Sequence, residues 1–249
     1  MGIKERRTKL LLLLFLFSNP ELSSVTINER LQLIFDISLN QKTKGIIRKM
    51  IDDKLVTQVE KTKDADIQLS LTENGFQALC LEFPFFRFLR QEWDGKWRIL
   101  SYEIPEKKRD LRDRLRREVA GWGLGPWHRS FWVTPHPIIP SLSRLVSHKE
   151  EEKYIQCFEA THEFGDRSIL IDKVWATATL EKEYRAMFKV WHDVLSGTED
   201  KGVKMTKIMS EYIEKLRMDP GLPKELVGEK WIGYEAYTIF KEVRSILMG

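Results

Sequence analysis

Basic side chains gather between residues 40 and 63, where seven Lys and Arg stand against three Asp and Glu. Ammonium and guanidinium groups at this density suit the phosphates of a nucleic acid backbone. Ile46, Ile47 and Met50 recur at helical spacing, so the basic side chains point mostly away from this apolar face. The residues expected to contact DNA are Lys42, Thr43, Lys44, Arg48 and Lys49, with Lys61 and Lys63 on phosphate.

Exposed lysines on a helix also have a plainer interpretation as solubilising groups, and a small helical domain with a hairpin often serves protein contacts. Gly45 in mid-helix costs about 1 kcal/mol relative to Ala, and Asp52 and Asp53 dilute the basic face. The pattern favours DNA binding, and a non-catalytic adaptor is kept as the alternative.

Local signals predict the elements that present this helix. The spacing Thr26-x-x-Glu29 is a capping box for a second helix, and Ser38 or Asn40 caps the third. Apolar residues alternate with polar ones over residues 55–71, which predicts a β-hairpin with Lys61 and Lys63 at its tip, the part called the wing below. Helix, helix, basic helix and hairpin is the order of a winged helix-turn-helix, whose third helix enters the major groove.

The start of the chain has basic residues followed by eight apolar residues, Leu10 to Phe17. This resembles the first part of a signal peptide, but Glu5 interrupts the basic segment and no small-x-small cleavage site follows. We favour a first helix buried on most sides. No apolar run approaches the about 20 residues that cross a bilayer. With only two cysteines, a reducing cytoplasmic location without membrane contact is expected.

The middle of the chain predicts alternating strands and helices. A strand over residues 97–104 is followed by an Arg-rich helix, a strand over 129–134, a helix over 139–149 and strands over 154–164 and 168–175. This order is close to a ferredoxin-like layer. The Arg-rich helix offers a second basic surface, although Asp and Arg at i, i+4 spacing favour a solvated face with internal ion pairs.

The expected fold class is α+β, in three domains. These are an N-terminal winged helix-turn-helix DNA-binding domain at residues 1–90, a central ferredoxin-like βαβ layer at 91–176 and a C-terminal helical domain at 177–249. The last has three amphipathic segments whose apolar faces must be buried. A small-molecule site, if the chain has one, is expected where this helical part meets the central layer.

Residues 93–137 carry a family resemblance, through W-D-G-x-W at Trp93, a strand ending in Pro-Glu, an R-D-R-L-R-R helix, a G-x-G turn and a W-V-x-P strand. The segment is similar to the central region of the phenylacetic acid degradation repressor (PaaX-type) family of transcriptional regulators. The run Asp219 to Pro223, with Trp231, Gly233, Tyr234, Ala236 and Phe240, resembles the closing helix of that family. The resemblance implies a homodimeric repressor that binds double-stranded DNA and is released by a small-molecule effector.

The same middle segment also resembles the small CRISPR-associated ferredoxin-like nuclease family. In that family a strand ends in Y-D-I, and the Asp pairs across a dimer to hold a divalent metal. Here the run is Tyr102-Glu103-Ile104. A metal-dependent nuclease using Glu103 is therefore an alternative, weighed against Glu103 as a strand residue or ion-pair partner.

Further chemistry has little support in the sequence. The five histidines show no H-x-x-x-H spacing or Cys partner, so no zinc site is expected. No phosphate loop, dinucleotide fingerprint or nucleophile elbow occurs, so neither a cofactor nor an enzyme is expected. The 249 residues carry a net charge of +4, which is too small to indicate nucleic-acid binding without the local concentration described above.

Overall fold

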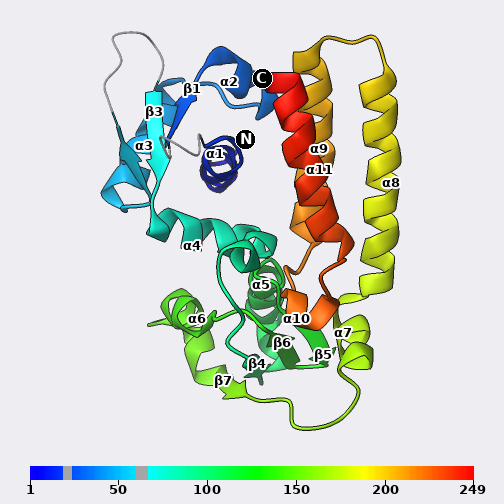
Figure 1. Ribbon diagram of the computed structural model, residues 1–249. Coiled ribbons are helices and arrows are strands. Elements are labelled where there is room, and N and C mark those ends of the chain that lie inside the picture. Colours follow the sequence, from blue (N-terminus) through cyan, green and yellow to red (C-terminus); the bar gives the residue numbers. More distant parts are fainter. Residues whose placement is uncertain (19–23, 60–66) are drawn as a thin grey trace. The chain divides into compact units, whose positions relative to one another are not determined.

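The computed structural model describes residues 1–18, 24–59 and 67–249, an α+β chain with antiparallel sheets (Figure 1). It divides into two compact units. Unit 1 comprises residues 1–82, 187–214 and 238–249, and unit 2 comprises residues 83–186 and 215–237. The three-domain division given above stays a prediction.

Unit 1 is built around its first helix, α1 (Ile3–Phe17), which Figure 1 shows end-on with α3, α4 and β3 around it. Every residue from Leu10 to Leu16 is buried. Seven consecutive apolar residues cover the whole circumference of a helix, so such a helix must be enclosed. The prediction of a first helix buried on most sides is confirmed.

A short strand that the sequence reasoning missed follows α1. The chain continues through β1 (Ser24–Ile27), α2 (Glu29–Ile34), α3 (Gln41–Asp52), β2 (Val56–Gln58), β3 (Ile67–Leu71) and α4 (Glu73–Glu82). The sheet order is β1-β3-β2, antiparallel, with Val25 opposite Leu69 and Thr57 opposite Ser70.

The predicted capping box is wrong, because Thr26 lies in β1 and pairs with Gln68. The cap of α2 is Asn28, whose side chain accepts a hydrogen bond from the Leu31 N–H at 3.0 Å. The β-branched run from Val25 to Ile27 suits a strand, and pairing with β3 decides in its favour.

Three long helices, α8 (Thr177–Ser196), α9 (Lys201–Met218) and α11 (Ile232–Met248), contribute residues to both units, and a short α10 (Lys224–Val227) precedes the last. They follow the three amphipathic segments predicted. In unit 1 their aromatic side chains pack together, with the rings of Tyr212 and Phe240 stacked at 4.8 Å and Trp191 edge-on to Tyr212. Arg30 donates to the Leu247 carbonyl at 2.6 Å and so joins α2 to α11.

Unit 2 contains a four-stranded antiparallel sheet of order β5-β6-β4-β7. The elements run β4 (Trp97–Tyr102), α5 (Arg109–Ala120), β5 (Gly125–His128), β6 (Phe131–Thr134), α6 (Ile139–Val146) and β7 (Ile155–Ala160), a β-α-β-β-α-β sequence. Three 3-10 helices accompany them, η1 (Pro84–Leu89), η2 (Glu106–Lys108) and η3 (Glu150–Tyr154). The strand predicted over residues 129–134 is β6, and β5, which the sequence reasoning missed, precedes it and pairs with it in a short hairpin.

The strand predicted over residues 168–175 is wrong, because that segment forms helix α7 (Arg167–Trp175). Asp166 caps it, accepting hydrogen bonds from the N–H groups of Ser168 and Ile169. Ile171 and Val174 then reach a core with Trp97 and Val133 of the sheet. An N-cap satisfies otherwise unpaired helical N–H groups. The prediction considered only the apolar run and did not take Asp166 as a helix cap.

Candidate functional site

The basic helix α3 begins at a well-formed cap. Asn40 is the N-cap, and its Oδ1 accepts a hydrogen bond from the Thr43 N–H at 3.0 Å. Of the two caps predicted, Ser38 and Asn40, the structure has Asn40. Ile46, Ile47 and Met50 are buried, so one face of α3 is fixed against unit 1 and the opposite face is presented outward.

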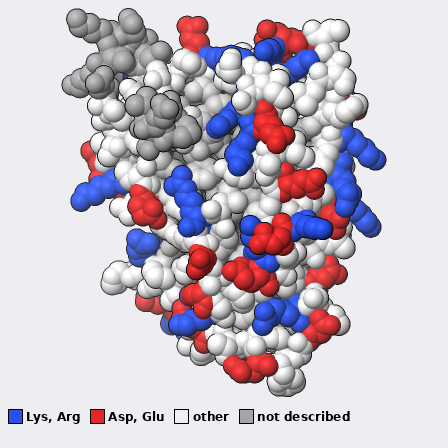
Figure 2. Space-filling model, in the orientation of Figure 1, with Lys and Arg blue, Asp and Glu red and all other residues white. Residues whose placement is uncertain are grey.

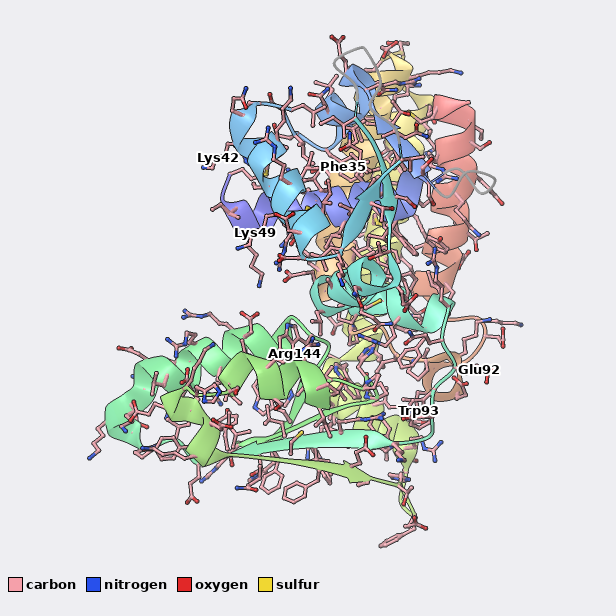
Figure 3. The ribbon with its side chains drawn as sticks, turned by 90° about the vertical axis from the view of Figure 1, so that its left-hand side faces the viewer. Phe35, Lys42, Lys49, Glu92, Trp93 and Arg144 are labelled. Atoms are coloured by element: carbon pink, nitrogen blue, oxygen red, sulfur yellow. The ribbon has the colours of Figure 1, made fainter. Side chains whose placement is uncertain are left out.

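The cations predicted to bind DNA lie on that outward face. Lys42, Arg48 and Lys49 are exposed and Lys44 is half-buried. Figure 3 shows Lys42 and Lys49 projecting from α3, while Phe35 lies inside unit 1. Within the described ranges, none of these four side chains forms an ion pair or hydrogen bond with another residue. The wing lysines Lys61 and Lys63 lie outside the described residues.

Thr43 is the exception among the predicted contact residues. It is fully buried, and its hydroxyl accepts a hydrogen bond from Arg6 Nη1 at 2.9 Å and donates to Asn40 Oδ1 at 3.3 Å. A side chain enclosed in this way does not reach DNA, so we remove Thr43 from the expected contacts. Sequence reasoning missed Arg6 as its partner, because nothing in the local spacing relates residue 6 to residue 43.

The Arg-rich helix α5 differs from α3 in that its charges are largely paired. Arg112 donates to Glu106 at 2.6 Å and holds the pKa of that carboxyl below its usual range. Arg114 pairs with Glu151, and Arg109 lies 3.5 Å from Asp113 at the expected i, i+4 spacing. On the face shown in Figure 2, Lys and Arg are interspersed with Asp and Glu. The cations of α3 therefore differ from those of α5 because no acidic side chain is paired with them, and not because they are more numerous.

Glu103, the residue of the nuclease alternative, lies exposed just beyond β4. Its N–H donates to the Tyr154 carbonyl at 2.9 Å, and the preceding Tyr102 is buried with its hydroxyl accepting from Trp132 Nε1 at 3.2 Å. The part of the chain that the structure describes holds no group of three or more His, Cys, Asp or Glu placed to bind a metal ion.

Asp219 and His136 are buried polar side chains of unit 2 that bond to the segment after α9. Asp219 accepts from the Tyr184 hydroxyl at 2.7 Å and from the Gly221 N–H at 2.8 Å, and burial raises the pKa of its carboxyl. His136 lies 2.7 Å from the Pro220 carbonyl through Nε2. Since a carbonyl only accepts, Nε2 carries the proton. Burial and the charge of Arg87 lower the pKa of His136 to about 3, so the ring is neutral.

A cavity of about 280 Å³ lies beside Asp219 and Pro220, lined mainly by the loop after α5, the end of α7 and the segment after α9. Gly123 lines it with φ +81°, and a Cβ there would come within 2.7 Å of the Pro220 carbonyl oxygen. Trp175 Nε1 donates to the Gly123 carbonyl at 3.2 Å. Helical and sheet elements of unit 2 meet at this cavity, which is the kind of place expected for a small-molecule site.

Comparisons with known proteins agree with the resemblance seen in the sequence. Residues 90–169 match the family model described as the PaaX protein central Cas2-like domain, and residues 175–249 match the PaaX-like protein C-terminal domain. No curated protein matches. No helix in the described ranges combines the length and apolarity that a membrane span requires.

A solved structure of similar fold is the uncharacterized protein Rv0674 from Mycobacterium tuberculosis. Its TM-score is 0.50 at 18% identity, over 96% of this chain and 97% of that chain. At this identity the likeness concerns the fold alone. The two family matches together span most of the chain, and we conclude that it belongs to the PaaX family.

Proposed function

We propose that this protein is a homodimeric, non-enzymatic transcriptional repressor that binds double-stranded DNA through α3. The observation that carries the proposal is the set of cations on α3, Lys42, Lys44, Arg48 and Lys49, which have no partner among the described residues. Charged groups left unpaired on a rigid helix are available to phosphates and base edges. Family membership supports a regulatory role over the adaptor alternative.

Topology supports a winged helix-turn-helix in unit 1. The order α1, β1, α2, α3, β2, β3 with a β1-β3-β2 sheet places α3 second in the helix pair and a hairpin directly after it. In such a domain α3 enters the major groove. The predicted wing includes the residues between β2 and β3, where Lys61 and Lys63 are expected to add phosphate contacts.

The effector part of the proposal is located in unit 2. The cavity beside Gly123 and Asp219 is lined by elements that are far apart in sequence, so a ligand there would couple the end of α9 to the loop after α5. A ligand with different affinities for the DNA-bound and free forms shifts the equilibrium between them. Release from the operator is the expected outcome.

The experiment has two steps. Sequencing genomic fragments retained by the purified protein identifies the operator. Dissociation constants for that fragment are then measured across a salt series for wild type, Arg48→Ala and Lys49→Ala. Each lost phosphate contact should lower the salt slope by about 0.9, and a contact to a base edge should instead weaken binding by about 1–3 kcal/mol and relax specificity.

The matched control is Lys107→Ala, which removes an exposed cation of η2 next to the Arg-rich helix. Net charge falls by the same amount in the control and in the α3 variants, so only position differs. Unchanged affinity and slope for both α3 variants would refute DNA binding through this helix. Equal losses in the control would reduce the effect to general electrostatics.

A further inference from the structure

We propose that Arg6 of α1 is a positioning residue, which holds the first turn of α3 so that Lys42 and Lys44 meet DNA in a fixed direction. The proposal rests on the DNA-binding function given above. Arg6 Nη1 donates to Thr43 Oγ1 at 2.9 Å and approaches Asn40 Oδ1 at 3.4 Å. Arg6, Asn40 and Thr43 are called the clamp below.

The clamp acts on the cap of α3. Asn40 Oδ1 already accepts from the Thr43 N–H and hydroxyl, so Arg6 adds a third donor to the same two residues. A cation near a helix N-terminus is unfavourable against the helix dipole, and side-chain acceptors that face it offset this cost. The bonds therefore hold Arg6 in place, and Arg6 in turn holds Thr43.

The clamp connects a rigid element to the residues proposed to contact DNA. Residues Leu10 to Leu16 of α1 are buried in the core of unit 1. In the first turn of α3, by contrast, only Thr43 is buried. Lys42 and Lys44 flank Thr43 in the chain, so fixing Thr43 fixes the directions of both neighbours. Arg48 and Lys49 lie a turn further on, between the buried Ile47 and Met50, and do not depend on the clamp.

Two variants break the clamp differently. Arg6→Gln removes the charge and shortens the side chain by two bonds, so its amide no longer reaches Thr43, and Thr43→Val removes the acceptor while nearly keeping the volume. We expect each to raise the dissociation constant for the operator about tenfold, because DNA binding must then re-order a first turn that has lost a bond to a charged group worth about 1.5 kcal/mol. Thr43→Ser, which keeps the hydroxyl, should bind close to wild type.

The salt slope separates positioning from contact. If Arg6 acts through Thr43, the slope stays at the wild-type value in Arg6→Gln. A fall by about 0.9 would mean that Arg6 itself binds phosphate, and it would overturn the proposal. Arg7→Gln is the matched control, because Arg7 follows Arg6 on α1 and its side chain has no bond to another described residue. An equal loss of affinity in this control would also overturn it.

A double-mutant cycle gives a readout that general destabilisation does not move. With the clamp broken, Lys42→Ala should cost less affinity than in wild type, because Lys42 is already misdirected, while Arg48→Ala should cost the same in both backgrounds. Equal coupling for the two residues would overturn the proposal.

Hydrogen exchange without DNA supplies an independent measurement. The amides of Thr43 and Lys44, which bond to Asn40, should exchange about tenfold faster in Arg6→Gln, as an opening free energy lower by about 1.4 kcal/mol requires. Unchanged exchange would overturn the clamp. If wild type binds no DNA, the proposed function fails together with this inference. If wild type binds and Arg6→Gln binds equally well, only the inference fails.

Discussion

Buried His136 should make the stability of unit 2 sensitive to mild acid. In the native protein the side chain is buried, its Nε2–H is bonded to the Pro220 carbonyl and the ring stacks on Phe88 at 4.9 Å. Burial and Arg87 lower its pKa to about 3, from an ordinary value of 6.5. Between these two pKa values the unfolded chain therefore binds a proton at His136 and the folded chain does not.

The sign and size follow from linkage. Above the ordinary histidine pKa both states are neutral and the contribution to stability is complete. Below it only the unfolded state gains the proton, so the free energy of unfolding falls by about 1.4 kcal/mol per pH unit, until the folded ring also protonates near its own pKa. Between the two pKa values the free energy of unfolding falls by about 5 kcal/mol in total, of which about 2 kcal/mol is lost by roughly pH 5.

The assay is urea unfolding, followed by tryptophan fluorescence, at several pH values between about 7 and 5. His136→Gln retains a donor for the Pro220 carbonyl but cannot titrate, so the difference between wild type and variant should shrink as pH falls. His148→Gln, which removes an exposed histidine, controls for lost titration at the surface and should behave like wild type. Parallel pH profiles for wild type and His136→Gln would refute the reasoning.

Three further substitutions have definite expected outcomes. Asp219→Ala leaves the Tyr184 hydroxyl and the Gly221 N–H without their acceptor, and should cost about 3 kcal/mol or more in urea unfolding. Gly123→Ala forces a side chain into φ +81° against the Pro220 carbonyl, and should cost about 2 kcal/mol or more, measured in the same way. Glu103→Ala should leave operator binding unchanged, and wild type should not cleave DNA or RNA with Mg²⁺ or Mn²⁺; cleavage lost in the variant would promote the nuclease alternative.

Regular elements with strong local signals could be predicted from the sequence. The Leu-rich helix is apolar on every side, so its burial followed from composition alone. Ser38 and Asn40 ahead of an amphipathic run located the start of α3 to within two residues, and the strand predicted over residues 97–104 is β4, which ends two residues earlier. These signals lie within a few residues of the element they specify.

Errors arose where a distant partner decides the outcome. Val25 to Ile27 are a strand because β3 pairs with them from more than 40 residues away. In the site, Thr43 was expected on DNA because it sits among basic residues. Its burial depends on Arg6 of another helix, and no spacing rule relates the two positions.

The contrast between α3 and α5 shows why charge counts do not locate a binding surface. Both are 12-residue helices rich in basic side chains, and α5 together with η2 has seven basic residues, against four on α3. Yet Lys108 and Arg114 meet Glu150 and Glu151, supplied by η3 from the far side of a hairpin and a helix. Paired charges must lose these partners before they bind phosphate, whereas the cations of α3 give up only water. The fold, through where it places acidic residues, makes α3 the better candidate for the DNA contact proposed above.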